Sequence, residues 1–371
     1  METITIGEAC DILNGYAFKS EEYVSSGIRI IRIANVQKGY IEDTSPVFYP
    51  LDSTGLDKYM LKENDLLLSL TGNVGRTALL DKEKLPAALN QRVACLRLKT
   101  NKLINGYLFH LLNSDYFESK CSQSSQGVAQ KNLSTEWLKS YELPLYSISK
   151  QKEITKTLDN VRKIIDDKES QLHKYDELIK ARFVEMFGDP VLNSYELPEA
   201  TLPELGELGR GVSKHRPRND PKLLGGDYPL IQTGDVANAD LYISSYNATY
   251  SDFGLKQSKK WDKGTLCITI AANIAKTAIL EFDACFPDSV VGFVANDKTS
   301  NVFIHYWFSF FQKILESQAP ESAQKNINLK TLSELKVIVP PVELQNEFVL
   351  FVRQVDKSKY DDMYIYKCTR I

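Results

Sequence analysis

Apolar side chains recur at alternating spacings of three and four residues between residues 150 and 187, in a segment that contains no proline. This a/d heptad pattern is typical of a coiled-coil helix, and it predicts a single helix of about 36 residues. Lys168 and Arg182 are its polar exceptions, and the Gly-Asp-Pro sequence at 188–190 should end it. A helix this long cannot bury its stripe inside a domain of ordinary size, so we expect it to need a helical partner. The stripe consists of Ile154, Leu158, Val161, Ile165, Leu172, Tyr175, Ile179 and Met186.

Outside this segment, apolar residues gather in short runs that are separated by glycine, asparagine, aspartate and proline. The runs at 28–36 and 266–270 are rich in β-branched residues and predict strands. Segments 107–119 and 303–317 are apolar at helical spacing and predict helices. The chain is therefore expected to belong to the α+β class, with many loops.

The chain is also an internal repeat. A shift of 200 positions places segment 66–80 (LLLSLTGNVGRTALL) on segment 266–280 (LCITIAANIAKTAIL). A shift of 194 positions then aligns the two copies of AQKN, at 129–132 and 323–326. Repeat units of this length are duplicated domains and not solenoid modules, whose periods are about 20–50 residues. Each copy should therefore perform the same kind of task.

The duplication extends into a helix after each domain, because the helix start at Gln151 matches Gln345. The second helix repeats the first part of the apolar stripe, and its pattern then fades, so we expect it to be shorter. The repeated positions are Phe348, Val352 and Val355. We expect two pseudo-repeated domains, each followed by a long helix, with the two helices packing as an antiparallel coiled-coil spacer. Plain linker helices are the alternative. The expected boundaries are 1–149 and 189–343 for the domains, and 150–188 and 344–371 for the helices.

Composition limits the classes of protein to consider. The 371 residues include 45 Lys and Arg against 48 Asp and Glu, a net charge of −3. This balance excludes binding of polyanions by bulk charge, although a local basic face remains compatible with it. No run approaches the roughly 18 apolar residues of a membrane span, and the first residues lack the pattern of a secretory signal. The six cysteines form no CxxC pair and the four histidines are scattered, so we expect a cytoplasmic protein with reduced thiols and no metal site.

Motifs of covalent chemistry are missing from the sequence. The G-x-G at 209–211 lacks the third glycine of a nucleotide-binding loop, and we find no Walker A lysine, GxSxG or HExxH. The pair Glu334 and Lys336 resembles a magnesium-holding nuclease site, but its counterparts in the first copy are Ser140 and Glu142. We therefore expect no catalytic residue and no cofactor.

Several loops carry candidate contacts to nucleic acid. In the loops at 71–77 and 271–277, small residues precede a cation, an arrangement that suits a phosphate. The loop at 212–220 crowds four basic residues around a proline, and the two QKN sequences could contact bases or phosphates. Solvated loops and helix caps are the alternatives. The candidates are Lys19, Arg32, Asn73, Arg76, Arg92, Lys131, Lys214, His215, Arg216, Arg218, Asn273, Lys276 and Lys325.

The repeat order, with a long heptad helix in the middle, resembles the specificity subunit of type I restriction-modification systems. The parts that carry the resemblance are the blocks at 66–76 and 266–276, the helix starts at 147–154 and 340–348, and the sequence DELIKARFVEMFGDP. The tail after Val355 departs from the family pattern because it shows no heptad.

The resemblance implies that each domain reads one half of a bipartite, asymmetric site in double-stranded DNA. It also implies that the helices set the spacing and dock two methyltransferase subunits, and that restriction subunits with ATP-dependent translocase and nuclease activity join them. The chain itself would be non-catalytic. Two other classes remain open at this point: a coiled-coil protein-interaction scaffold with two duplicated ligand-binding domains, and a solitary methyltransferase or nuclease.

Overall fold

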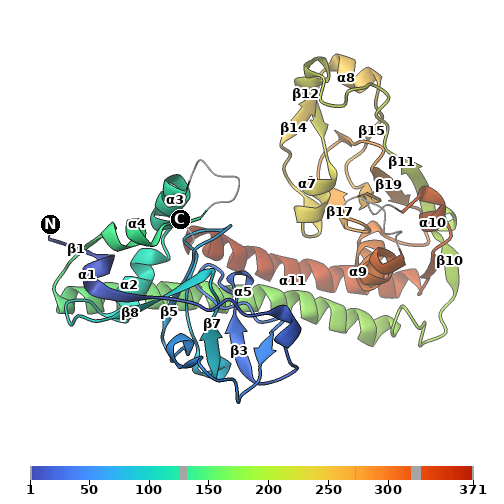
Figure 1. Cartoon of the computed structure of the whole chain (residues 1–371). Helices are drawn as coiled ribbons and strands as arrows, with labels where there is room; N and C mark the ends of the chain where they lie inside the picture. The colour runs from blue at the N-terminus through green and yellow to red at the C-terminus, as the bar shows by residue number, and fades with distance from the viewer. Residues whose placement is uncertain (1, 126–131, 272, 319–326, 370–371) are drawn as a thin grey trace. The chain divides into compact units, whose positions relative to one another are not determined.

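The structure, a computed structural model, describes residues 2–125, 132–271, 273–318 and 327–369 (Figure 1). The chain divides into two compact units, residues 1–164 and residues 165–371. The division falls inside the longest helix, which therefore contributes its first part to unit 1 and its last part to unit 2. In the part of the chain that the structure describes, no helix is both long enough and apolar enough to cross a membrane.

Short strands make up most of unit 1. They are β1 (Thr3–Thr5), β2 (Cys10–Asn14), β3 (Ile28–Ile31), β4 (Phe48–Tyr49), β5 (Leu66–Ser69), β6 (Thr77–Leu79), β7 (Ala87–Leu89), β8 (Val93–Leu98) and β9 (Glu142–Pro144). A four-stranded antiparallel sheet has the order β2-β8-β5-β6, and a second sheet has the order β4-β3-β7, with β3 and β7 parallel. A separate pair joins β1 to β9, so the first strand of the unit meets the strand that closes it.

The helices of unit 1 cover one face of the four-stranded sheet. They are α1 (Ile6–Ala9), α2 (Asn105–Leu112), α3 (Asp115–Ser124), α4 (Thr135–Ser140) and the first part of α5 (Ile148–Phe187). The single helix expected at 107–119 is two helices, because Ser114 Oγ accepts the N–H of Phe117 at 3.2 Å and so caps a new helix. The strand expected at 28–36 is shorter, since residues 33–35 form a turn of 3₁₀ helix.

The apolar run of β5 is buried on both faces. Leu66 and Leu68 pack in the core under the helices, whereas Leu67 packs in a second core with Ile31 and Leu89 of the other sheet. Alternate side chains of a strand point to opposite faces, and both faces are covered here. This explains why the segment reads as a continuous apolar run in place of an alternating one.

Unit 2 repeats this architecture with small additions. Its strands are β10 (Glu199–Thr201), β11 (Gly206–Arg210), β12 (Leu224–Leu230), β13 (Tyr242–Ile243), β14 (Ala248–Tyr250), β15 (Lys260–Trp261), β16 (Leu266–Thr269), β17 (Thr277–Leu280), β18 (Ala284–Cys285), β19 (Val290–Ala295) and β20 (Lys336–Ile338). The sheet orders are β11-β19-β16-β17-β13 and β14-β12-β18-β15, and β10 pairs with β20. The register repeats as well, because Cys267 pairs with Ala278 as Leu67 pairs with Ala78.

The helices of unit 2 differ from those of unit 1 mainly in length. They are α6 (Leu202–Leu205), α7 (Thr233–Asn238), α8 (Asp252–Lys256), α9 (Asn301–Gln318), α10 (Leu329–Ser333) and α11 (Val342–Thr369), in addition to the last part of α5. One continuous helix, α9, stands where unit 1 has α2 and α3, in agreement with the helix expected at 303–317.

The expected long helix is present as α5, which spans 40 residues. It ends at Phe187, and the next residue, Gly188, has a φ of +75°, the left-handed conformation that commonly follows a helix C-terminus. The side chains that it buries most deeply are not all those of the predicted stripe. Ile179, Phe183 and Phe187 are 1%, 0% and 0% exposed, and the heptad pattern had assigned Arg182 and Met186 in place of the two phenylalanines. The reason is that this part of α5 belongs to the core of unit 2, which covers a wider arc of the helix than a coiled-coil seam would.

Within unit 2, α11 lies antiparallel to the last turns of α5 (Figure 1). The ring centroid of Phe348, near the start of α11, lies 5.3 Å from Phe183 and 5.7 Å from Phe187. Farther along α11, Lys359 Nζ lies 2.8 Å from Asp176 Oδ1, and Asp176 precedes Phe183 in α5 by about two turns. Helix α11 spans 28 residues and is thus shorter than α5.

Candidate nucleic-acid interface

A buried glutamine fastens each domain to the start of its helix. Gln151 is 0% exposed. Its Oε1 accepts the N–H of Ile104 at 3.0 Å, and its Nε2 donates to the carbonyls of Lys102 and Tyr146 at 2.7 and 2.8 Å. The side chain therefore holds the segment before α2 against the start of α5.

The matching glutamine does the same in unit 2. Gln345 is 1% exposed, and its Nε2 donates to the carbonyls of Lys298 and Pro340 at 3.0 and 2.9 Å. Its Oε1 accepts the hydroxyl of Thr299 at 3.0 Å. The sequence match at these two positions thus marks a positioning contact, which fixes how each helix leaves its domain.

The repeated small-residue loops have one internal construction. In unit 1, Ser69 Oγ donates to the carbonyl of Asn73 at 2.5 Å and accepts the N–H of Arg76 at 3.0 Å. In unit 2, Thr269 Oγ1 donates to the carbonyl of Asn273 and accepts the N–H of Lys276 at 3.0 Å. Both asparagines are exposed. A hydroxyl at the end of the preceding strand therefore fixes each loop, with its asparagine in solvent.

The cation of the first loop is turned back toward its own unit. Arg76 Nη1 donates to Gln37 Oε1, and Arg76 Nε lies 3.8 Å from Glu118 Oε1 of α3. The side chain is 29% exposed. Its charge is thus partly compensated before any ligand arrives.

The cation of the second loop occupies the equivalent place. Lys276 lines a cavity of about 220 Å³ together with Asp240, Asp356 and His305. Burial lowers the pKa of His305 to about 4, so its ring is neutral, and the Nδ1 atom lies 2.9 Å from Thr277 Oγ1. In both copies the repeated cation faces the helical side of its unit, whereas the repeated asparagine faces solvent.

The basic loop of unit 2 gathers two of its four cations around one carboxylate. Arg218 Nη2 donates to Asp288 Oδ1 at 2.5 Å, and Arg216 Nη2 lies 3.7 Å from Asp288 Oδ2. His215 is directed elsewhere, with Nε2 2.8 Å from Asp220 Oδ2. Lys214 is exposed at the edge of the group.

An arginine that the sequence did not single out as a contact completes this group. Arg210 ends β11, and its Nε donates to the carbonyl of Asp288 at 2.7 Å. Arg210, Arg218 and Asp288 line a cavity of about 350 Å³ that also reaches Ala271 and Asn328. The sequence signal for Arg210 was the glycine on either side of it, which had been considered only as part of a nucleotide-binding motif. Gly211 in fact allows close packing, since a Cβ there would lie 2.4 Å from the carbonyl oxygen of Phe286.

The remaining candidates of unit 1 are dispersed. Lys19 is exposed and lies 3.4 Å from Glu22 Oε1. Arg32 follows β3, and its Nη2 donates to the carbonyl of Ser45 at 2.8 Å. Arg92 precedes β8 and is exposed, and its carbonyl accepts the N–H of Leu70 at 3.0 Å. Of the three, Arg92 is the one whose backbone bonds to the residue directly before the 71–77 loop.

The QKN candidates Lys131 and Lys325 lie outside the described residues. The neighbouring Asn132 is described and forms a bridge with Thr71, so this segment runs beside the first small-residue loop. Asn132 does not cap a helix, because Ser134 is the N-cap residue of α4.

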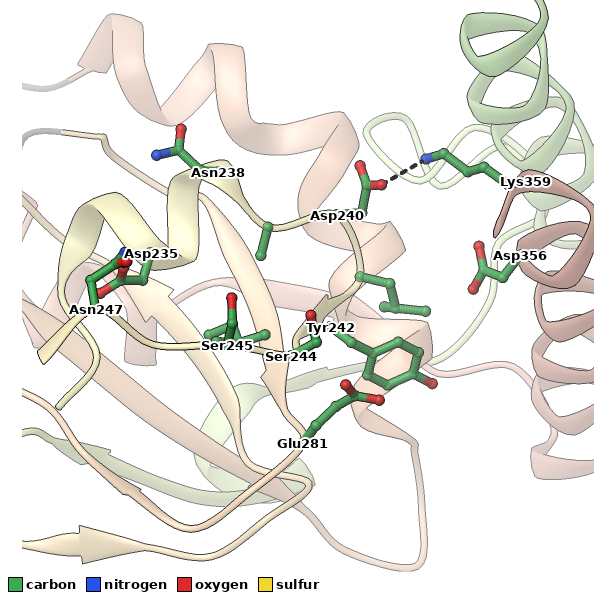
Figure 2. Close-up of a pocket in the computed structure, with 13 residues that line it drawn as sticks. Asp235, Asn238, Asp240, Tyr242, Ser244, Ser245, Asn247, Glu281, Asp356 and Lys359 are labelled. Atoms are coloured by element: carbon green, nitrogen blue, oxygen red, sulfur yellow. Dashed lines mark hydrogen bonds and ion pairs between the residues drawn. The ribbon is translucent and has the colours of Figure 1, made fainter. Parts of the chain in front are cut away.

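An acidic cavity of about 530 Å³ adjoins the Lys276 cavity in unit 2 and shares Asp240 and Asp356 with it (Figure 2). Asp240, Glu281 and Asp356 line it, and burial raises the pKa of Asp356 to about 6. Lys359 Nζ, at its edge, lies 3.4 Å from Asp240 Oδ2 (Figure 2). This surface would repel a polyanion, so the cavity beside Arg210 is the better candidate. Among the described residues, no cluster of three or more side chains is suited to hold a metal ion.

Comparison with known proteins agrees with this arrangement. The family model of the type I restriction modification DNA specificity domain matches residues 1–174 and 199–361. The specificity subunit of the type I restriction enzyme EcoBI of Escherichia coli is 25% identical over 384 residues, which cover 95% of this chain and 78% of that protein. The EcoAI specificity subunit of the same organism is 34% identical over 194 residues, which cover 48% of this chain and 33% of that protein.

Solved structures show the same fold. The S subunit of a type I restriction-modification system from M. genitalium matches with a TM-score of 0.57 and 16% identity, over 100% of this chain and 92% of that one. A chain from a structure on the complex assembly and conformational transition of a type I R-M system matches with a TM-score of 0.54 and 16% identity, over 100% of this chain and 94% of that one. The chain therefore belongs to the family of type I restriction-modification DNA specificity subunits, with two copies of the recognition domain on one polypeptide.

Proposed function

We propose that each recognition domain reads one half of a bipartite, asymmetric DNA site while helices α5 and α11 set the distance between the halves. The observation that carries this proposal is the duplication itself, in which one fold and one strand register occur twice with different loop residues. Two domains with different exposed side chains on one fold are suited to two different short sequences. The helix that follows each domain would set the spacing between the two half-sites.

The contacts between α5 and α11 support a spacer role for the helices. Phe348, Val352 and Val355 of α11 are at most 7% exposed, and they share one core with Ile179 and Phe183 of α5. A flexible linker would bury none of these side chains. Antiparallel packing of this kind resists bending, because each bend would separate apolar surfaces whose burial contributes roughly 25 cal/mol per Å².

The first part of α5 supports the docking of other subunits. Leu158, Val161 and Ile164 are 40%, 37% and 46% exposed. Apolar side chains that follow one another along a helix and face water are typical of a surface that another protein covers. We assign this surface of the spacer to the docking of two methyltransferase subunits, which would supply catalysis and cofactor binding. Restriction subunits would then join that assembly. The chain itself then carries no catalytic residue.

The charge of the chain supports a model in which the partner subunits supply part of the affinity for DNA. The net charge of −3 gives no bulk attraction to DNA, and placed cations such as Arg210, Arg216 and Arg218 must supply the contact. Phosphate contacts from the partners would supply the remaining affinity. We therefore expect weak DNA binding by the isolated chain and tight binding by the assembly.

The test is footprinting of the chain reconstituted with its methyltransferase subunits on duplex DNA. The expected result is protection of two short blocks separated by a constant gap. A single continuous block, or protection that is independent of sequence, would overturn the proposal. Retention of the isolated chain on heparin and on duplex DNA at low salt tests the scaffold alternative. If the intact assembly also flows through both columns, the scaffold replaces the DNA reader.

A further inference from the structure

In both domains one antiparallel strand pair ends at the same place with an arginine. In unit 2, Arg210 is the last residue of β11 and pairs with Val291 of β19. In unit 1, the equivalent last residue of β2 is Asn14, which pairs with Ala94 of β8. Each is followed by a glycine that allows close backbone contact, and a Cβ on Gly15 would lie 2.2 Å from the carbonyl of Asn90. The two strand ends are therefore equivalent positions.

The residue that precedes the partner strand is equivalent as well. The carbonyl of Arg92, before β8, accepts the N–H of Leu70 at 3.0 Å, and the carbonyl of Ser289, before β19, accepts the N–H of Ile270 at 3.0 Å. Leu70 and Ile270 lead directly into the two small-residue loops. Unit 1 thus has the pair asparagine and arginine at this strand end, and unit 2 has arginine and serine. Each domain places one arginine at this end, Arg210 as the last residue of the first strand and Arg92 directly before the second strand.

The Arg210 guanidinium is oriented and still free to bind. Its Nε donates a hydrogen bond to the carbonyl of Asp288, while its two Nη atoms have no partner among the described residues. The carboxylate of Asp288 is already engaged by Arg218 and Arg216 and forms no bond with Arg210. Arginine presents its donors as a rigid planar fork, so an anchored Nε leaves the outer edge fixed for two parallel hydrogen bonds. Arg92 is exposed and likewise has no side-chain partner among the described residues.

We infer that Arg210 in the second domain and Arg92 in the first are base-reading residues at the matching strand end, each of which contacts a guanine of its own half-site. This inference rests on the proposed function. A bidentate arginine matches the O6 and N7 acceptors of guanine, which is the commonest specific contact in the major groove. Phosphate oxygens offer the same acceptor geometry, but a phosphate contact carries no sequence information. The arginine occupies a different position of the strand pair in each domain, which suits two half-sites of different sequence. Arg216 and Arg218 are then available for contacts with the phosphate backbone of the DNA.

The experiment selects duplexes from a randomised library with the full chain reconstituted with its methyltransferase subunits. Wild type is compared with Arg210→Ala, Arg210→Lys and Arg92→Ala. For R210A the expected result is loss of the guanine preference at one position of one half-site, with binding to the wild-type site weakened about 5- to 150-fold. The other half-site should keep its preferences. R92A should show the same effect in the other half-site. R210K keeps the charge but not the fork, so it should lose the preference as R210A does. Lys330→Ala, which removes an exposed cation of α10, is the matched control and should change nothing.

Three outcomes would overturn the inference. The first is an unchanged sequence preference in R210A, and the second is a loss of preference in both half-sites at once. The third is a uniform loss of affinity with a lower salt slope, which would make Arg210 a phosphate contact only. Failure of the proposed function is distinguishable from all three, because the wild-type assembly would then select no bipartite sequence at all.

Discussion

Truncation of Phe183 tests whether the core of unit 2, and not the heptad seam, sets the packing of α5. Phe183 is fully buried. Its ring centroid lies 4.9 Å from Phe187, 5.3 Å from Phe303, 5.1 Å from Phe310 and 5.3 Å from Phe348. The side chain thus joins α5 to α9 and α11. Phe183→Ala removes this aromatic contact from all three helices at once.

The expected loss follows from burial and contact. Transfer of a phenylalanine side chain out of water contributes about 1.5–3 kcal/mol, and the cavity and lost ring contacts add to it. Buried Phe→Ala substitutions cost about 3–5 kcal/mol in total, and we expect this range for Phe183. With a urea m-value of about 2 kcal/mol per M, the unfolding midpoint of unit 2 should fall by about 2 M.

Tryptophan fluorescence can follow unit 2 alone. Trp261 and Trp307 are both buried in unit 2, and Trp137 is in unit 1, so a Trp137→Phe background removes the signal of the first unit. The matched control is Val184→Ala at the next position of the same helix, which is 38% exposed and should shift the midpoint by less than about 0.5 M. A shift in F183A no larger than that of V184A would refute the packing described above.

Two further predictions concern the same unit. Gln345→Ala should destabilise unit 2 by about 1–3 kcal/mol, because it leaves the carbonyls of Lys298 and Pro340 without their donor. Glu343→Ala at the exposed start of α11 is the control, and equal urea midpoints for the two variants would contradict the positioning role. The second prediction is a pH dependence. His305, whose pKa is lowered to about 4 in the folded chain from an ordinary 6.5, makes the unit less stable as pH falls from 6.5 toward 4. Asp356, whose pKa is raised to about 6 from 3.8, has the opposite effect as pH falls from 6 toward 3.8. Asp356→Asn should therefore increase the stability lost between pH 7 and pH 5, measured as urea midpoints, and an unchanged loss would show that Asp356 does not titrate in this range.

Much of the architecture followed from the sequence because it depends on local pattern and on repetition. The heptad spacing predicted the long helix, and α5 ends at residue 187 as the Gly-Asp-Pro sequence indicated. The match of Gln151 with Gln345 identified two equivalent positions before their hydrogen bonds were known. Repetition is informative without a structure, since two copies that keep the same residue through independent change indicate the same local requirement.

The side-chain environments required the tertiary structure. The heptad pattern placed Arg182, as a polar exception, at a position of the stripe and passed over Phe183, because periodicity carries no information about how wide an arc the neighbouring helices cover. The loop cations Arg76 and Lys276 are candidates for phosphate contact, and the structure adds that they face the helical side of their units. Arg76 lies beside Glu118, and Lys276 lines a cavity with Asp240, and both acidic residues are distant in sequence from the cations.

The arginine at the strand end is a second feature that the tertiary structure reveals and the sequence pattern does not. Sequence alignment by a constant shift cannot relate Arg210 to Arg92, because Arg210 ends the first strand of its pair whereas Arg92 precedes the second strand of its own pair. Only the strand register brings their positions to one end of the sheet. The sequence by itself determined the duplication, the long helix and the family, since these depend on spacing along the chain. The tertiary structure alone decided which side chains share a surface, because hydrogen-bonded pairing joins residues about 80 positions apart.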